Sequence, residues 1–298
     1  MTKQMRADGL LVLITFFWGI SYLLMDISLN ELDPFTLNSF RFLGAFFIAG
    51  IASWKRLVNV NKTTLMYSVI IGSLMVFVYL GATFGVKYTS ISNSGFLCSL
   101  TVIFTPIIEW LFLRKIPDRR LSIAIIVCTV GIGLLTLGDG FSLGAGHLKG
   151  DLLCLLCAFS YSITLISTEK AVSNEKVNAF QLGVLQIGVT GTWNLLLAFI
   201  FETPSLPGSA EVWASAIFLS IFCTGLAFII QPIAMKDTTA SHVGVIFSLE
   251  PVFSAIVAFI FANERLSAKA YFGAFLMMSS IFIMELDFKT IFKKKKEG

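Results

Sequence analysis

The chain has 298 residues, of which 56% are hydrophobic and 13% charged, with a formal net charge of +4 and a mean hydropathy of +0.84. These values exclude an ordinary soluble domain, in which about a quarter of the residues are charged, and predict an integral membrane protein. The 5 cysteines fall inside apolar runs and the chain has only 2 histidines. Neither a disulfide framework nor a metal site is expected, and no cofactor.

Ten apolar runs of about the 20 residues needed to cross a bilayer follow one another along the chain. Lys3 and Arg6 precede the first run as they would in a signal peptide. No small-residue cleavage site follows, so this run is interpreted as the first transmembrane helix. The fold class expected is all-α and integral to the membrane, with ten transmembrane helices at about 9–29, 34–53, 64–86, 91–113, 121–137, 148–169, 179–201, 211–235, 239–262 and 268–286.

Lysine and arginine residues are distributed unevenly over the loops between these runs. If both termini are cytoplasmic, 17 of the 22 lie on the cytoplasmic side and 4 on the opposite side, with Arg41 inside a span. Cytoplasmic loops carry an excess of these residues, so we expect both termini in the cytoplasm. The basic run Lys293–Lys296 directly follows a span and is interpreted as a topology anchor on anionic lipid, not as a nucleic-acid site.

The two halves of the chain share a residue pattern. Ser99-Leu100 aligns with Ser248-Leu249 at an offset of 149, and Leu121-Ser122 aligns with Leu266-Ser267 at an offset of 145. The longest connection separates five spans from five, and because five is odd the two halves must have opposite orientations in the membrane. This is the inverted-repeat design of secondary transporters. We expect repeats at 1–142 and 143–288, then a basic cytoplasmic tail at 289–298.

The most informative stretch is Ser248-Leu249-Glu250-Pro251, inside the ninth run. At 1.5 Å per residue, Glu250 and Pro251 lie about 16 Å deep, near the bilayer centre. A carboxylate there is costly, so Glu250 is a candidate for proton coupling or for binding a substrate ammonium; the alternative is a structural acid beside the Pro251 kink. Pro106 is expected to break the fourth helix in a similar way, and broken helices at corresponding depths indicate a binding region.

Arg41 lies about 10 Å deep in the second span. A buried arginine needs a partner, and Asp26, near the outer end of the antiparallel first span, is predicted to form a structural ion pair with it. Gln186 aligns with Arg41 in the second half and is expected to play an uncharged version of the same packing role. Gly81 and Gly85 form a small-xxx-small pair, which predicts a close approach between helices.

Several motifs stand out along the chain, namely Phe17-Trp18-Gly19, Arg41, Gly150-Asp151-Leu152-Leu153, and Leu249-Glu250-Pro251 followed by Asn263-Glu264-Arg265-Leu266. Together they resemble the drug/metabolite transporter superfamily and, within it, the ten-helix EamA-like exporters with their "LEP … GERL" signature. Asn263 replaces the usual glycine, and Thr101-Val102 stands in the first repeat where Glu250-Pro251 stands in the second. The resemblance implies two inverted halves around a central cavity, helices five and ten at the periphery, and export of amino acids and other small metabolites.

The candidate substrate-binding residues are polar or aromatic side chains on the helices that this resemblance places around the cavity. Aromatic rings could stack on a ligand, although core or lipid contact is the alternative. Serine and threonine hydroxyls could bind a ligand or bond to their own backbone. The candidates are Trp18, Tyr79, Asn93, Ser99, Thr101, Tyr161, Ser248 and Glu250, with Glu250, Pro251 and Pro106 as coupling or gating residues.

The function expected is that of a secondary transporter that moves small polar metabolites, amino acids or related compounds, outward across the cytoplasmic membrane by alternating access. Import or facilitated diffusion by the same fold is the alternative, and a lipid flippase comes after it. The sequence has no HExxH motif, no paired aspartates within the spans and no Gly-rich phosphate loop, so an enzyme is not expected. The expected partners are a small-molecule substrate, membrane lipid and a coupled proton, with no nucleic acid, for a monomer or homodimer in a bacterial inner membrane.

Overall fold

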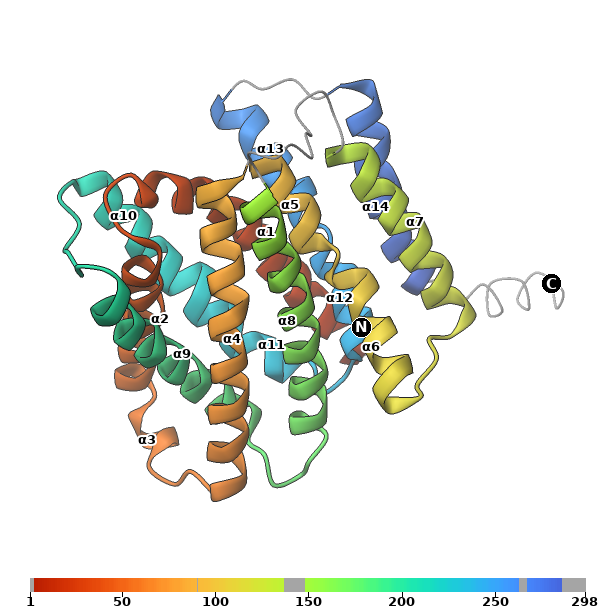
Figure 1. Cartoon of the computed structure of the whole chain (residues 1–298). Coiled ribbons are helices and arrows are strands. Elements are labelled where there is room, and N and C mark those ends of the chain that lie inside the picture. The colour runs from red at the N-terminus through yellow and green to blue at the C-terminus, as the bar shows by residue number, and fades with distance from the viewer. Residues whose placement is uncertain (1–2, 90, 137–147, 263–266, 286–298) are drawn as a thin grey trace, which may run out of the picture.

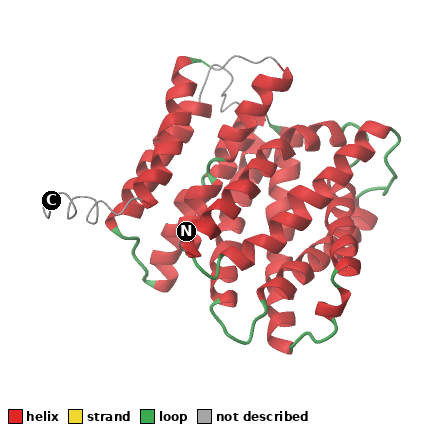
Figure 2. Cartoon of the chain, turned by 180° about the vertical axis from the view of Figure 1, so that it is seen from behind, coloured by secondary structure: helices red, strands yellow, loops and turns green. Residues whose placement is uncertain are grey.

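The computed structural model describes residues 3–89, 91–136, 148–262 and 267–285. In these ranges every regular element is a helix, and the helices pack side by side as a bundle (Figures 1 and 2). The elements are α1 (Lys3–Leu29), α2 (Pro34–Ala52), α3 (Trp54–Leu57), α4 (Lys62–Tyr88), α5 (Ile91–Ser99), α6 (Thr101–Leu113), α7 (Arg119–Thr136), α8 (Leu148–Val172), α9 (Ala179–Phe201), α10 (Ala210–Phe218), the π-helix η1 (Leu219–Leu226), α11 (Ala227–Ala234), α12 (Ala240–Phe247), α13 (Glu250–Ala262) and α14 (Ala268–Glu285).

Each apolar run expected from the sequence contains one or more helices that cover most of its described residues. Eight helical segments are long and apolar enough to cross a membrane, and 268–284 is a shorter apolar helix. Three of the eight are composite, because α5 with α6, α10 with η1 and α11, and α12 with α13 each form one segment. The chain is therefore an all-helical, multi-pass membrane protein. The basic tail and the junction between the two expected repeats lie outside the described residues.

Short polar side chains mark the starts of several helices. Asn61 accepts a hydrogen bond from the Thr64 N–H at 2.7 Å where α4 begins, and Asn178 and Ser209 cap α9 and α10 in the same way. Pro34 begins α2, where its missing N–H leaves no helical bond unmade. These caps satisfy backbone donors at the helix starts, which fixes where the preceding connections end.

The closest packing joins helices from the two halves of the chain. α4 lies against α8 and α9, α2 lies against α9, and α7 lies against α14. Figure 1 shows α7 and α14 together at one edge of the bundle, the peripheral position that the family resemblance implies. The contact of α4 with α8 has a counterpart in the contact of α11 and η1 with α1, so the two halves pack in a related way.

Two of the spans are broken at equivalent positions. α5 ends at Ser99 and α6 begins at Thr101, whereas α12 ends at Phe247 and α13 begins at Glu250. The backbone ψ angle is −5° at Leu100 and −8° at Ser248, well away from the α-helical value. The two breaks coincide when the halves are aligned at the offset of 149.

The prolines take part in these breaks unequally. Pro251 directly follows the second break, as the sequence predicts. Pro106, by contrast, lies inside α6, beyond the first break at Leu100. The prediction that Pro106 breaks its helix is therefore wrong, since the first break forms without a proline.

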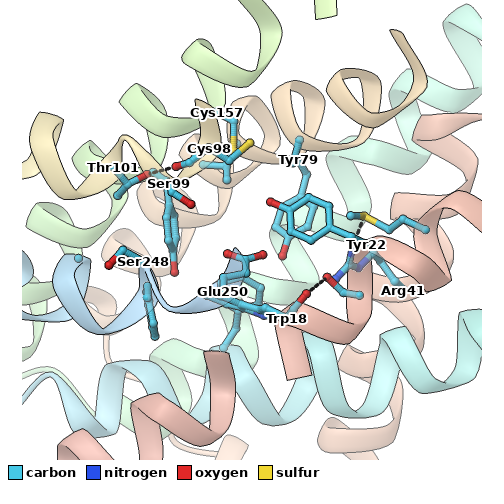
Figure 3. Close-up of a pocket in the computed structure, with 18 residues that line it drawn as sticks. Trp18, Tyr22, Arg41, Tyr79, Cys98, Ser99, Thr101, Cys157, Ser248 and Glu250 are labelled. Carbon is cyan, nitrogen blue, oxygen red and sulfur yellow. Dashed lines mark hydrogen bonds between the residues drawn. The ribbon is translucent and has the colours of Figure 1, made fainter. Parts of the chain in front are cut away.

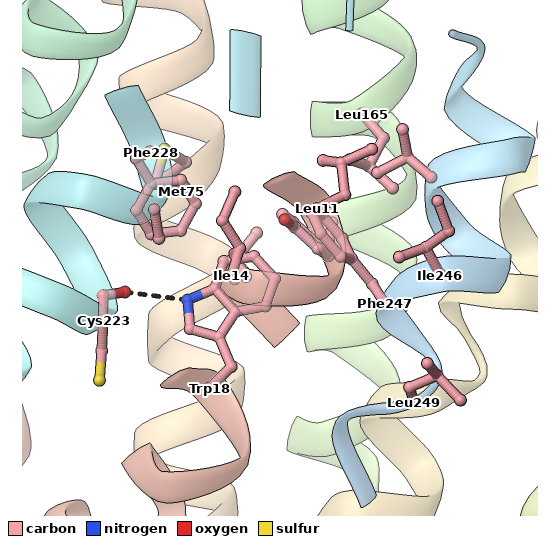
Figure 4. Packing of buried hydrophobic residues seen from close by; sticks show 14 of the residues in the cluster. Leu11, Ile14, Trp18, Met75, Leu165, Cys223, Phe228, Ile246, Phe247 and Leu249 are labelled. Atoms are coloured by element: carbon pink, nitrogen blue, oxygen red, sulfur yellow. Dashed lines mark hydrogen bonds between the residues drawn. The ribbon is translucent and has the colours of Figure 1, made fainter. Parts of the chain in front are cut away.

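A continuous hydrophobic core surrounds the middle of α1. Figure 4 shows the Trp18 ring near Ile14, Phe228 and Phe247, with its indole nitrogen directed at the carbonyl oxygen of Cys223. Trp18 is 6% exposed, and its Nε1 donates to that carbonyl at 2.9 Å. The core thus holds a polar hydrogen bond at its centre, which fixes the orientation of the tryptophan ring.

Candidate functional site

A cavity of about 70 Å³ lies at the centre of the bundle, next to both helix breaks (Figure 3). That volume suits a few water molecules or part of a small metabolite. Side chains from α1, α2, α4, α5, α6, α8, α11, α12 and α13 surround it, together with Ser248 at the second break. Its wall consists of Trp18, Ser21, Tyr22, Met25, Arg41, Val78, Tyr79, Ala82, Cys98, Ser99, Thr101, Cys157, Tyr161, Phe228, Gly244, Phe247, Ser248 and Glu250.

The structure brings seven of the eight predicted substrate-binding residues together in this wall. They come from five spans that are far apart in sequence, so their convergence is a property of the fold and not of local sequence. The side chain of the eighth, Asn93, lies outside the described residues. The predicted gating residues Pro106 and Pro251 are not among the wall residues. The seven are Trp18, Tyr79, Ser99, Thr101, Tyr161, Ser248 and Glu250.

Three of these residues carry hydroxyl groups that bond to backbone carbonyls. Ser99 donates to the Gly95 carbonyl and Ser248 to the Val245 carbonyl, each at 2.6 Å, while Thr101 donates to the Cys98 carbonyl at 2.9 Å. These bonds lie at the two breaks, where they stabilise the ends of α5 and α12. The structure thus favours the local structural role for these hydroxyls over direct ligand binding.

Glu250 is the first residue of α13, and its carboxylate points into the cavity in Figure 3. Tyr22 and Arg41 line the same cavity. Among the described residues no ion pair joins Glu250 to a basic side chain. The cavity wall therefore contains a carboxyl group that has no basic ion-pair partner among the described residues.

Arg41 projects from α2 into the same cavity and is 1% exposed. Its Nε donates to the Thr224 hydroxyl at 2.9 Å, its Nη1 lies 3.3 Å from the sulfur of Met25, and its guanidinium carbon lies 4.7 Å from the centre of the Tyr79 ring. The guanidinium group is thus held in place by contacts with a hydroxyl, a thioether and the face of an aromatic ring.

The predicted ion pair between Arg41 and Asp26 is not formed. Asp26 is exposed on α1, and no ion pair of the described residues includes it. The prediction rested on the closeness of two consecutive antiparallel helices, whereas the partner of Arg41 comes from η1, 183 positions away in sequence. Arg41 therefore belongs to the cavity wall and not to a structural pair at the outer surface.

A chain of aromatic rings runs along one side of the cavity. Trp18 contacts Phe247 and Phe228 with ring centres 4.7 and 5.5 Å apart, and Tyr161 stacks on Phe247 at 6.2 Å. The chain continues through Phe228 to Tyr79, 6.0 Å away, beside Arg41. These rings give the cavity an apolar wall that can also accept a cation on its faces.

Polar contacts join the helices on either side of the cavity along the bundle. Near the start of α1, Asp8 and His242 lie 3.1 Å apart, both buried. Glu109 at the end of α6 accepts from Ser241 and forms an ion pair with Lys115 at 2.9 Å.

At the other end of the bundle, the Thr89 hydroxyl donates to Asp151 at 2.7 Å. The Glu202 carboxylate accepts from the N–H groups of Phe35 and Thr36 at 2.9 and 2.8 Å, at the start of α2. Hydrogen bonds and ion pairs therefore join the helices near both ends of the bundle.

Sequence reasoning missed several wall residues, among them Ser21, Tyr22 and the cysteines Cys98 and Cys157. Tyr22 lies one helical turn beyond Trp18 on the same face of α1, so helical spacing from Trp18 was the signal that could have found it. The sequence shows these cysteines only as members of apolar runs, which does not indicate their place at the cavity. No group of metal-ligating side chains occurs within the described ranges.

A multi-pass helical bundle with paired broken helices and a central cavity defines a membrane transporter. The sequence pattern of the EamA-like transporter family matches residues 5–137 and, a second time, residues 148–286. The chain therefore belongs to that family, within the drug/metabolite transporter superfamily, and has its two-repeat fold.

Relatives in archaea and bacteria agree with this assignment. An uncharacterized transporter of Archaeoglobus fulgidus is 29% identical, covering 95% of this chain and 87% of its own. The uncharacterized transporter YvbV of Bacillus subtilis is 24% identical, covering 93% and 90%. A solved crystal structure that is 17% identical superposes with a TM-score of 0.80, covering 96% of this chain and 98% of that chain, and so has the same fold.

Proposed function

We propose that this protein is a secondary transporter that exports a small zwitterionic metabolite, of the amino acid class, across the cytoplasmic membrane. The observation that supports this proposal is the presence of Arg41 and Glu250 in the wall of one cavity without an ion pair between them. A zwitterion offers a carboxylate to the guanidinium and an ammonium to the carboxylate. Its apolar part would lie against the aromatic rings.

We also propose ten membrane passes in two inverted repeats, with both termini cytoplasmic. The related packing of the halves and their equivalent breaks support the inverted arrangement, in which alternating access follows from rocking of one half against the other. Each terminus would then lie on the side that carries the excess of lysine and arginine. A bacterial inner membrane remains our proposal for the location, with a monomer or homodimer as the working unit.

Proton coupling through Glu250 is the mechanism that we propose for export against a gradient. When the cavity opens to one side, a ligand ammonium and a proton would compete for the same carboxylate, so one would leave as the other binds. Arg41 stays charged throughout and would hold the ligand carboxylate. Transport would then depend on the pH gradient as well as on the substrate gradient.

The test is transport by purified protein in proteoliposomes, with and without an imposed pH gradient, for the native chain and Glu250→Gln. We expect the variant to lose gradient-driven accumulation of neutral amino acids and to keep exchange between internal and external substrate. Asp26→Asn is the matched control, because it also replaces a carboxylate by an amide but at an exposed position outside the cavity. It should behave as the native protein does.

Two results would contradict the proposal. If native protein and Glu250→Gln move the same ligand with the same pH response, Glu250 is structural and the protein is a facilitator driven by the substrate gradient, our second candidate. If a sugar phosphate is transported saturably and amino acids are not, the zwitterion assignment is wrong. Transfer of a fluorescent lipid between leaflets, without either activity, would favour a flippase.

A further inference from the structure

The middle of the span formed by α10, η1 and α11 is a π-helix, Leu219–Leu226. Its counterpart in the first half, α4, is a continuous α-helix over Lys62–Tyr88. A π-helical turn is rare, and where it occurs it often lies at a functional site, because it changes which backbone groups and side chains face the neighbouring helices. The two halves of the protein thus differ at a place that borders the cavity.

Two consecutive residues of η1 bind the two cavity side chains that stand out in the sequence. The Cys223 carbonyl accepts from Trp18 Nε1, and the Thr224 hydroxyl accepts from Arg41 Nε, each at 2.9 Å. In an α-helix the N–H of Ala227 would bond to the Cys223 carbonyl, but here it bonds to the Thr224 carbonyl. The Cys223 carbonyl therefore accepts from the indole.

The same turn contacts the residues immediately before those side chains. The Cys223 thiol donates to the Phe17 carbonyl at 3.2 Å, and the Ser220 hydroxyl donates to the Phe40 carbonyl at 3.3 Å. Cys223 and Thr224 are fully buried. η1 therefore holds both the backbone and the side chain at two cavity positions, one on α1 and one on α2.

For Arg41 this arrangement fixes the plane of the guanidinium. Nε is held by Thr224, and Nη1 is held against the sulfur of Met25. The group also lies over the Tyr79 ring. Because binding of a carboxylate by two parallel N–H bonds depends on the direction of the guanidinium plane, the orientation given by Thr224 affects ligand affinity directly.

We infer that the π-helical turn η1 is a positioning element for the ligand site, and that Thr224 is the positioning residue that orients the Arg41 guanidinium toward a ligand carboxylate. The carboxylate part of this inference rests on the proposed function. The orientation of Arg41 by Thr224 does not, because it concerns a bond within the protein.

The test compares Thr224→Val, which keeps the shape and removes the hydroxyl, with Thr224→Ser, which keeps the hydroxyl. Thr164→Val is the matched control, since the buried Thr164 hydroxyl bonds to the Ser160 carbonyl of its own helix. The first measurement is the ¹⁵N spectrum of arginine Nε–H groups in detergent, in which the Arg41 signal is assigned by its loss in Arg41→Lys. We expect slow exchange with solvent in the native protein, Thr224→Ser and Thr164→Val, and fast exchange in Thr224→Val.

The second measurement is competition binding of L-leucine and of isoamylamine, which is leucine without its carboxylate. We expect Thr224→Val to weaken leucine binding about tenfold, the size expected for misdirecting one charge-assisted hydrogen bond, and to leave isoamylamine unchanged. Thr224→Ser should restore the leucine affinity.

Each outcome decides a separate claim. Slow exchange at Arg41 in Thr224→Val would overturn the positioning role, whatever the ligand. Equal weakening of leucine and isoamylamine would also overturn it, since the effect would then be a general loss of packing. If the native protein binds neither compound, the proposed function loses its substrate class, while the exchange measurement still decides the role of Thr224.

Discussion

The packing of α4 on α8 depends on two glycines whose contacts differ in kind. A methyl group at Gly81 would lie 2.7 Å from the backbone nitrogen of Cys157 and even closer to the Leu153 carbonyl oxygen. At Gly85 it would clash with the Cys154 sulfur, and the next nearest atom would be 3.8 Å away. The first clash involves the backbone of α8 and the second a side-chain atom. We therefore predict that Gly81→Ala forces the two helices apart and that Gly85→Ala does not.

The expected magnitudes follow from two opposing effects. Overpacking against a fixed backbone costs about 1–3 kcal/mol, whereas alanine in place of glycine inside a helix stabilises by about 0.5–1 kcal/mol. Gly81→Ala should therefore lower the free energy of unfolding by up to about 2 kcal/mol. Gly50→Ala, where no atom lies within 4 Å, is the control and should be neutral or slightly stabilising. Reversible unfolding in mixed micelles measures all of these variants.

Rescue experiments separate the two clashes. Cys154→Ala removes the sulfur that opposes Gly85→Ala and should restore the stability of that variant. Cys157→Ala should not restore Gly81→Ala, because the opposing atoms belong to the backbone. Cys157 also lines the cavity, so Gly81→Ala should reduce transport as well as stability. Equal stabilities for Gly81→Ala and Gly50→Ala would show that α8 adjusts freely and would refute this account of the contact.

Two further predictions concern single hydrogen-bonded groups. The Ser209 hydroxyl and the backbone N–H groups of Gly208 and Ser209 lower the pKa of Glu31 from its ordinary 4.5. The ionised carboxylate therefore stabilises the fold above pH 4.5. This stabilisation is lost as the pH falls through the lowered pKa of the folded state. Melting temperatures measured from about pH 6 down to about pH 3 should therefore fall less in Glu31→Gln than in the native protein, and parallel curves would contradict this. Gln186 Nε2 donates to the Phe228 carbonyl at 3.0 Å, so Gln186→Leu should leave this buried acceptor unpaired. We expect this variant to lower the free energy of unfolding by about 1–3 kcal/mol in the same micelle assay, and an unchanged stability would contradict the role of the bond.

The bond from Gln186 has a cause that is visible in the sequence. Pro232 lies four residues after Phe228 in α11, where an N–H would bond to the Phe228 carbonyl in a regular α-helix. Proline has no N–H, so that carbonyl needs another donor, and Gln186 supplies it from α9. The sequence shows the proline and therefore the unmet acceptor. It does not show which residue on a neighbouring helix meets it.

The spans could be predicted because they follow from patterns that repeat over many residues, namely apolar runs of spanning length. The break before Pro251 was expected from the proline, whereas the first break lies at Leu100 and not at Pro106, where it was expected. Trp18, Tyr161 and Glu250 lie at mid-span, but the family resemblance was needed to place their helices around one cavity, where the fold brings them together.

Contacts between distant helices could not be predicted in this way. The partner of Arg41 was sought on the neighbouring helix, because adjacency in sequence was the only guide, and Asp26 was chosen in place of Thr224. The π-helix is equally hidden, since the apolar stretch Leu219–Leu226 has no proline or charge to mark a change of helical pitch. Both features depend on which helices of the two halves pack against each other in the folded protein.

The duplication gives the protein a symmetric scaffold and an asymmetric site. Glu250 corresponds to Thr101, whose hydroxyl bonds to the backbone, and Arg41 corresponds to Gln186, whose amide bonds to a carbonyl. The charged groups of the cavity thus come one from each half, and neither has a charged counterpart. A zwitterion bound to both would have a single orientation and would bridge the halves. In the alternating access that we propose, rocking of one half against the other would change the separation of Arg41 and Glu250. A ligand that spans both charges would then favour one arrangement of the halves over another, which is the differential binding that this mechanism requires.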